Sequence, residues 1–204
     1  MQVLEKTITL FLMASLFLAP VWAAPGPPTE VVKGAVQGVL DILNNPAYQA
    51  QKDYRRQLVK QTVDARFDYQ EMAKRCLGGT WSGLSDAQRD DFVQLFAQLL
   101  EASYYDKIEK YTQNIRIDYT GEIVDDCYAE VKSVIVRPND RIPFNFRLLQ
   151  DAGGWKVYDV VIEGVSLVSN YRSQFTRVIH ESSYAELVRR LRNRVNQLQQ
   201  TGGA

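Results

Sequence analysis

Four segments between Ile115 and Ile162 have the composition of β-strands, and those at 115–120 and 142–149 alternate apolar with polar residues as half-buried strands do. The segments span 115–120, 131–136, 142–149 and 155–162. Turn-forming residues at 138–140 and 151–154 join the last three segments as hairpins. Because such short turns connect neighbouring strands that run in opposite directions, the sequence predicts an antiparallel sheet of four strands.

Apolar residues recur at helical spacing both before and after these strands. Polar capping residues mark where several helices should begin, and Ser85 with Gln88 has the spacing of a capping box. The predicted helices start near Thr29, Ala47, Asp68, Ser85, Ser166 and Ser183. Helices that precede and follow an antiparallel sheet along the chain indicate an α+β fold. We expect the N-terminal and C-terminal helices to pack on the four-stranded sheet.

The first residues have the layout of a secretory signal peptide. A polar start containing Lys6 precedes an apolar run from Ile8 to Ala19, and small residues at 21–23 offer a cleavage site. The run is shorter than the roughly 20 residues of a membrane-spanning helix. We therefore expect residues 1–23 to be removed and residues 24–204 to form one exported domain.

Little in the composition supports catalysis, metal binding or nucleic-acid binding. The chain has one histidine, His180, and a formal net charge of zero. No cysteine pair has metal-ligand spacing, and no glycine pattern matches a nucleotide-binding loop. We expect no cofactor and no metal. Cys76 and Cys127 can form a disulfide in an oxidising compartment or remain two buried thiols, and the sequence leaves both readings open.

The segment from Gly154 to Phe175 joins a strand with apolar residues on both faces to an aromatic helix. Gly164 favours a turn between them, and Ser166 stands where it can cap the helix. Asp159 lies in the middle of the strand. A buried carboxylate beside Tyr158 could transfer protons in a pocket enzyme, whereas a structural role through hydrogen bonds or an arginine pair is the favoured interpretation.

Several motifs in this order resemble the MlaC, or toluene-tolerance, family of periplasmic phospholipid-binding proteins. They comprise Phe67-Asp68-Tyr69, Met72-Ala73, Leu77-Gly78, Trp81, Leu84-Ser85, Gln88-Arg89, Phe92, Leu99-Leu100, Tyr104, Gly154 to Val160, Glu163 to Val168, Asn170-Tyr171-Arg172 and Phe175.

The resemblance implies a monomeric, non-enzymatic carrier with an apolar cavity between its helices and its sheet. Such a carrier takes phospholipid through the periplasm between an outer-membrane lipoprotein complex and an inner-membrane complex of an MCE-domain protein with an ABC transporter, and so maintains outer-membrane lipid asymmetry. The same family includes proteins associated with hopanoids, so a hopanoid or another lipid is an alternative cargo. A pocket enzyme using Asp159 and an adaptor protein with a filled core are the competing hypotheses.

With this cavity in view, apolar residues of the longest predicted helix, the last two strands and the helix after Gly164 are the candidate pocket wall. They are Phe92, Phe96, Leu99, Leu100, Tyr104, Phe144, Phe146, Val160, Ile162, Val165, Val168, Tyr171 and Phe175. Lys156 and Arg172 are the candidates for contact with a phosphate head group.

Overall fold

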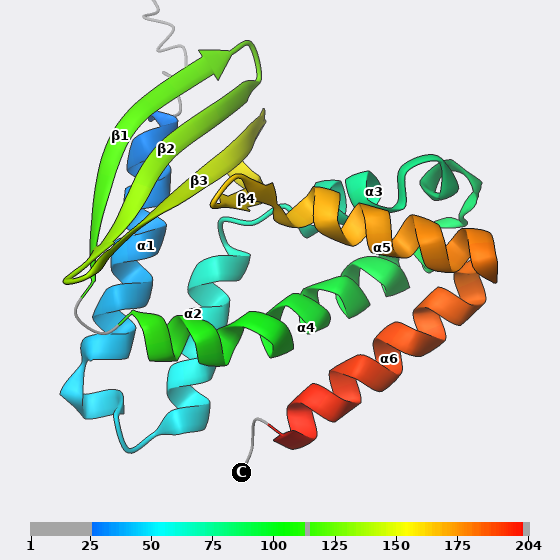
Figure 1. Ribbon diagram of the computed structural model, residues 1–204, viewed down its shortest axis with the longest axis horizontal. Coiled ribbons are helices and arrows are strands. Elements are labelled where there is room, and N and C mark those ends of the chain that lie inside the picture. The colour runs from blue at the N-terminus through cyan, green and yellow to red at the C-terminus, as the bar shows by residue number, and fades with distance from the viewer. Residues whose placement is uncertain (1–25, 113–114, 202–204) are drawn as a thin grey trace, which may run out of the picture.

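The computed structural model describes residues 26–112 and 115–201, so the predicted signal peptide at 1–23 lies outside the described residues. The described chain consists of six α-helices and a β-sheet (Figure 1). Their bounds are α1 Pro28–Asn44, α2 Lys52–Asp64, α3 Tyr69–Leu77, α4 Asp86–Tyr111, α5 Leu167–Glu181 and α6 Tyr184–Thr201. Within residues 26–112 and 115–201, no helix combines the length and hydrophobicity that crossing a membrane requires.

The sheet is antiparallel throughout, and its strands lie in the order of the chain. The strands are β1 Arg116–Asp125, β2 Tyr128–Arg137, β3 Asp140–Asp151, β4 Gly154–Ile162 and β5 Val165–Ser166. The α+β fold is therefore confirmed, with one strand more than predicted. A turn in which Glu163 and Gly164 have φ angles of 50° and 81° folds the chain back, so that Val165 pairs with Ile162.

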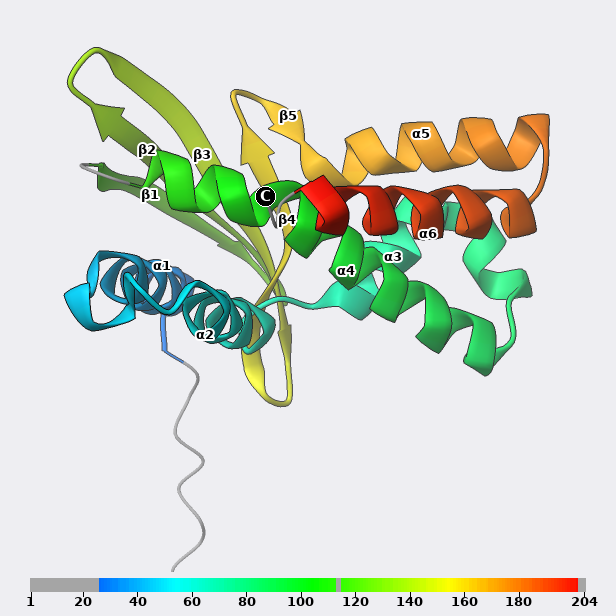
Figure 2. The same ribbon diagram turned by 90° about the horizontal axis from the view of Figure 1, so that it is seen from below.

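The helices divide into two groups around the sheet (Figure 2). Helices α1 and α2 lie together on one side of the molecule, and α5 and α6 lie on the other, with α4 crossing between the groups. The face of the sheet that carries Val131 and Phe146 packs against Val32 of α1. Helices α3, α4, α5 and α6 instead bury their apolar residues mainly against one another.

Capping side chains explain most of the helix boundaries. Asp68, Ser85 and Ser166 each accept a hydrogen bond from a backbone N–H in the first turn of their helix, and Ser85 with Gln88 forms the predicted capping box. The predicted cap at Thr29 is wrong, because α1 begins at Pro28 and Thr29 donates its hydroxyl to Glu122 of β1. That contact fastens the start of α1 to the sheet.

The second helix begins later than predicted. Asn45 accepts a hydrogen bond from the N–H of Ala47, and residues 46–48 form a short 3-10 turn. Proline at position 46 fixes its own φ and cannot donate a backbone hydrogen bond. The chain therefore reverses direction there, and α2 starts at Lys52.

The Asp159 carboxylate accepts three hydrogen bonds, two of which connect β4 to the start of α5. Its carboxylate is 2 % exposed and accepts from the Ser166 hydroxyl at 2.6 Å and from the Val168 N–H at 3.0 Å. Arg147 of β3 donates to the same carboxylate at 3.3 Å. A buried carboxylate with this set of donors is a structural group, because its acceptor sites are occupied by protein. The interpretation of Asp159 as a structural residue is thus supported, and the pocket enzyme loses its candidate acid.

We expect Asp159→Asn to lower the free energy of unfolding by about 2–4 kcal/mol, because an amide replaces an acceptor-only group among three donors and leaves Arg147 without its buried partner. Urea denaturation measures the loss. Asp151→Asn is the matched control: Asp151 pairs with the exposed Lys156, and the amide oxygen keeps the bond to Gly153. The control should change stability by less than about 0.5 kcal/mol, and an equal loss in both variants would contradict the structural role of Asp159.

Candidate functional site

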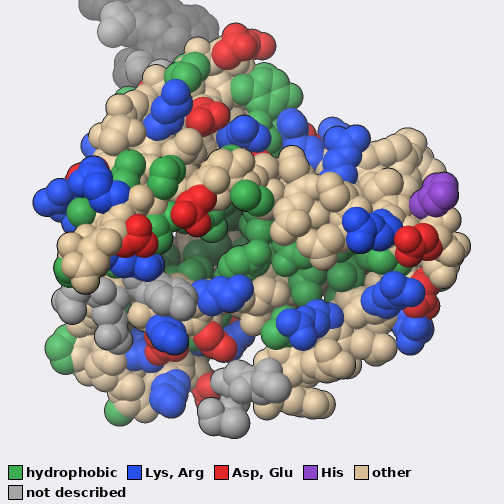
Figure 3. All heavy atoms as spheres, viewed as in Figure 1, with side chains coloured by type: hydrophobic (Ala, Val, Ile, Leu, Met, Phe, Trp, Pro, Cys, Tyr) green, Lys and Arg blue, Asp and Glu red, His purple; other side chains and the backbone are tan. Residues whose placement is uncertain are grey.

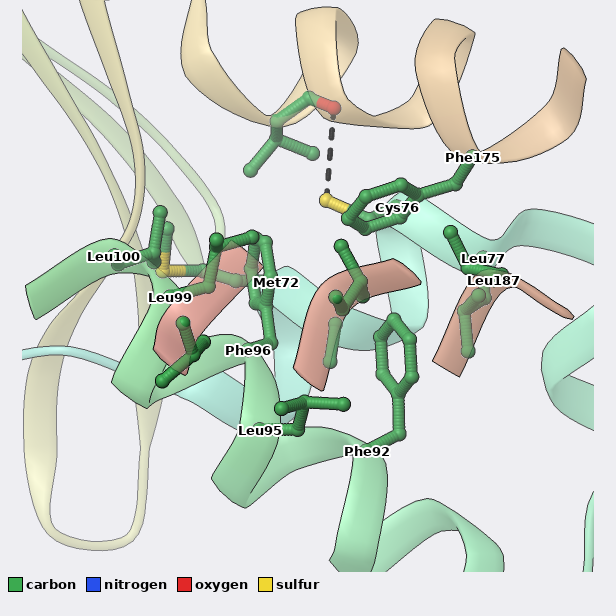
Figure 4. Packing of buried hydrophobic residues seen from close by; sticks show 14 of the residues in the cluster. Met72, Cys76, Leu77, Phe92, Leu95, Phe96, Leu99, Leu100, Phe175 and Leu187 are labelled. Carbon is green, nitrogen blue, oxygen red and sulfur yellow. Dashed lines mark hydrogen bonds between the residues drawn. The ribbon is translucent and has the colours of Figure 1, made fainter. Parts of the chain in front are cut away.

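Aromatic rings from α4 and α5 form the centre of the helical core, which is the apolar cluster of α3, α4, α5 and α6 (Figure 4). Phe92 and Phe96 are fully buried on α4, and Phe175 of α5 is 2 % exposed. The ring centroid of Phe175 lies 5.8 Å from that of each of the two α4 phenylalanines. These distances are those of aromatic rings in direct contact, so this part of the molecule is packed protein.

The second apolar cluster, the sheet core, lies between α1 and one face of the sheet. Phe146 pairs with Val131 on one side and with Val160 on the other, so the three side chains form a row on that face. The ring of Phe144, two residues before Phe146, lies 4.9 Å from the Phe146 ring. This row places bulky apolar groups directly under α1.

Each cluster also contains or borders residues that are only partly buried. On the sheet, Phe146 is 5 % exposed, Phe144 is half-buried, and Ile162, which pairs with Phe144, is 37 % exposed. On α4, the fully buried Phe96 is followed by the half-buried Tyr104. Apolar side chains that the protein itself leaves partly uncovered are candidates for contact with a ligand.

A hollow is visible in the middle of the molecule in Figure 3, in the region where Figure 1 shows the sheet, α4 and α5 around a gap. Hydrophobic side chains are visible inside it, and Lys, Arg, Asp and Glu side chains lie around its rim. An apolar interior with a charged rim suits a ligand that has an apolar body and a polar end.

The predicted wall residues lie in both apolar clusters and at the surface. The helical core holds Phe92, Phe96, Leu99, Leu100, Val168 and Phe175, with Tyr104 and Tyr171 partly buried at its border. The sheet core holds Phe146 and Val160, with Phe144 partly buried beside them. Ile162 and Val165 are exposed at the turn between β4 and β5, at 37 % and 62 %. Tyr104, Tyr171, Phe144, Ile162 and Val165 therefore keep part of their surface uncovered.

The two head-group candidates lie on different elements. Lys156 is at the start of β4, where its ammonium is 3.6 Å from Asp151, and it points away from the face that carries its neighbour Val157. Arg172 is exposed on α5, and its guanidinium lies over Gly78. The structure does not bring these two cations together.

Ser103 and Lys107, which the sequence did not single out, lie beside the predicted wall residues Tyr104 and Tyr171 at the border of the helical core. Tyr171 hydrogen-bonds with Ser103 and Tyr104, and the ammonium of Lys107 lies 5.0 Å from the centroid of the Tyr104 ring. Burial is the largest cause that raises the pKa of Tyr171 above its ordinary value, so its hydroxyl stays neutral. Ser103, Tyr104 and Lys107 lie within one turn of α4, a spacing that could have drawn attention to them.

The two cysteines do not form a disulfide. Cys76 is buried and its thiol donates a weak hydrogen bond to the carbonyl of Val168, whereas Cys127 is half-buried at the turn between β1 and β2. Burial, with a smaller contribution from Asp159, raises the pKa of Cys76 to about 12. In the part of the chain that the structure describes, no three His, Cys, Asp or Glu side chains gather as metal ligands would.

Comparison with known proteins gives consistent matches over most of the chain. The family profile described as MlaC protein matches residues 33–193. A curated relative from Haemophilus influenzae, an intermembrane phospholipid transport system binding protein, is 22 % identical over 198 residues, covering 94 % of this chain and 92 % of the relative. A solved phospholipid-binding protein from Ralstonia solanacearum, in complex with a phospholipid, superposes with a TM-score of 0.76 and 28 % identity, covering 85 % of this chain and 99 % of that one.

The difference between packed core and open wall predicts different mutational costs for two phenylalanines. Phe96→Ala should lower the free energy of unfolding by about 3–5 kcal/mol, because it leaves a cavity among rings that contact one another. Phe144→Ala should cost about 1–2 kcal/mol, because the half-buried ring has less apolar surface to lose. Urea unfolding of both variants tests this, and equal costs would place Phe144 in a packed core as well.

Thiol labelling distinguishes the two cysteines. In the native protein at neutral pH, we expect DTNB to react with Cys127 and to leave Cys76 unmodified, because Cys76 is buried and its pKa of about 12 keeps it a neutral thiol. Cys127→Ser should therefore abolish native labelling, and unfolding in urea should restore one reactive thiol. Rapid native labelling of Cys127→Ser would show that the helical core opens readily.

Proposed function

This chain belongs to the MlaC family, and from that membership we propose that it is a periplasmic carrier that binds phospholipid in the hollow between its sheet and its helices. The observation that carries the proposal is the apolar interior of the hollow, bordered by partly covered apolar residues of the sheet and of α4. The phospholipid named for the Ralstonia solanacearum structure and the transport role named for the Haemophilus influenzae relative both support this choice of ligand.

The physical need for such a carrier follows from the cost of exposing acyl chains to water. Two chains contain about 30 methylenes, and at about 0.8 kcal/mol for each, their exposure costs on the order of 24 kcal/mol. A protein that covers the chains removes most of this barrier to crossing an aqueous compartment. Binding of this kind needs no nucleophile and no metal, so we propose a function without catalysis.

We assign the wall of the pocket to the partly covered residues. Tyr104 and Tyr171 would border it on the helical side, and Phe144, with Ile162 at the rim, on the sheet side. The buried rings of Phe92 and Phe96 would support the wall from behind. Lys107, beside Tyr104, is a better placed cation for the phosphate than Lys156, which faces the other side of the sheet.

We further propose the periplasm as the compartment, reached through the predicted signal peptide. The partners would be an outer-membrane lipoprotein complex as donor or acceptor and an inner-membrane MCE-domain and ABC transporter complex at the other end. Because lipid extraction from a membrane is costly, the direction of transport would be set by the energy-consuming partner. In this arrangement the carrier acts as a monomer and maintains outer-membrane lipid asymmetry.

Native mass spectrometry of the protein after gentle purification tests the carrier function. We expect co-purified phospholipid, and replacing Phe144 by Glu should reduce it by about tenfold or more, because the variant puts a charge against the acyl chains. Ile123→Glu is the control, since Ile123 is 53 % exposed on the outer part of β1. The mass of the bound lipid also distinguishes a glycerophospholipid from a hopanoid.

Phe144→Ser is a second variant for the case in which Phe144→Glu does not fold, because it removes the ring without adding a charge. Folded wild-type protein that carries no lipid, and that takes up none from phospholipid vesicles, would overturn the carrier function. Normal lipid loading of both folded Phe144 variants would instead overturn the assignment of the wall.

A further inference from the structure

Strand β1 forms one edge of the sheet and pairs with β2 along only one of its sides. In Figure 1 it lies at the margin of the sheet, and within residues 26–112 and 115–201 no strand pairs with its other side. All residues from Thr120 to Asp125 are exposed, including Ile123 at 53 % and Val124 at 51 %. An open edge of this kind offers backbone N–H and C=O groups to another strand.

The register of β1 on β2 determines which of its backbone groups point outward. Asp125 pairs with Tyr128 across a two-residue turn in which Asp126 has a φ angle of 52°. The closing pair of such a tight hairpin is hydrogen-bonded. Because hydrogen-bonded and non-hydrogen-bonded pairs alternate in an antiparallel ladder, the N–H and C=O groups of Glu122 and Val124 point away from β2.

The bulge at Thr120 continues this outward row with a changed spacing. Ser133 of β2 donates its N–H to the Asn145 side chain on β3, so its partner on β1, Tyr119, also points outward. Two residues earlier, Ile117 does the same. The partners of the outward residues of β1 are the alternate residues 129, 131, 133 and 135 of β2, so the outward residues share one face of the sheet.

The outward residues are arranged symmetrically about the bulge. A two-fold axis between Thr120 and Gly121 would bring Ile117 opposite Val124 of a second copy, and Tyr119 opposite Glu122 of that copy. Both pairs join outward backbone groups with outward backbone groups and keep the side chains on the same face. A slip by one residue would place outward groups opposite inward ones, so the ladder itself selects this register.

The charges along β1 agree with the same register. Arg116 would lie opposite Asp125 of the second copy, and the symmetry repeats this pair at the other end of the contact. Asp118 would lie opposite Ile123, so no two like charges face each other directly. We propose that β1 pairs with β1 of a second copy in this register, so that one antiparallel sheet continues across the two-fold axis.

The contact of two single strands is smaller than the about 1,200 Å² that stable complexes bury. We therefore expect a dissociation constant between about 1 μM and about 1 mM. The dilute protein is the monomer of the proposed carrier function, and the dimer is a further state that does not depend on that function.

Disulfide trapping of the full mature protein tests the register. In a Cys127→Ser background, the double variant Asp118→Cys with Ile123→Cys places its two thiols in a non-hydrogen-bonded pair across the axis, with Cα atoms about 4.5 Å apart. Within one chain these positions are about 17 Å apart, so they cannot bridge to each other. Mild oxidation should give a covalent dimer.

Each single variant, Asp118→Cys or Ile123→Cys in the same background, is a matched control and should give about tenfold less dimer, because its thiol lies opposite a residue that is not cysteine. Equal trapping in the single and double variants would overturn the register. Absence of trapping in the folded double variant would overturn the dimer.

Sedimentation velocity of the protein without introduced cysteines tests the association and its charge pairs. The wild-type protein should shift from monomer to dimer between about 1 μM and about 1 mM. Arg116→Asp should weaken the dimer by about tenfold, and Arg116→Asp with Asp125→Arg should restore it, because both side chains are exposed and the exchange recreates the opposite charges.

A wild-type protein that remains monomeric at about 1 mM would overturn the dimer, and failure of the charge exchange to restore it would overturn the register. Co-purified phospholipid should be the same in Arg116→Asp as in the wild type. The lipid measurement therefore reports on the carrier function separately from the sedimentation measurement.

Discussion

The attachment of β4 to its neighbours determines how the rest of the molecule is arranged. On one side, the segment between α2 and α3 pairs with it, through the N–H of Asp68 to the carbonyl of Val157 and the N–H of Val157 to the carbonyl of Arg66, both at 2.8 Å. Further along the strand, Asp159 holds the start of α5. Both of these connections from the sheet to the helical core therefore pass through β4, at Val157 and Asp159.

This arrangement explains why the molecule has two apolar clusters instead of one continuous core. The sheet core closes against α1, and the helical core closes on itself, so the region between them is covered only where β4 brings them together. Phe144 and Tyr104 keep part of their apolar surface uncovered. At about 25 cal/mol for each Å² of apolar surface, a lipid that covers these side chains gains free energy that the protein alone does not.

The sequence predicts the elements well because periodicity and capping are local. Asp68, Ser85 and Ser166 begin their helices as expected, and the alternation of apolar residues identifies the strands. The fifth strand was missed because its turn places Glu163, which is not a glycine, at a positive φ. Thr29 was misassigned because its partner, Glu122, is distant in the sequence.

The site was harder to predict than the fold for a related reason. Phe92 and Phe144 both belong to clear apolar rows, yet one is fully buried among rings and the other is half-covered. Periodicity shows which face of an element is apolar, whereas the distance to the facing element decides whether that face meets protein or a ligand. The sequence did not single out Lys107, because its closeness to the Tyr104 ring appears only in three dimensions.

Helix α1 covers the sheet core through Val32, and contacts with other elements hold both of its ends. Its start is held by Thr29 and Glu122, and its end is held by Leu43 in a small cluster with Val59 and Tyr105. A helix fixed at both ends cannot move toward the edge of the sheet without breaking one of these contacts.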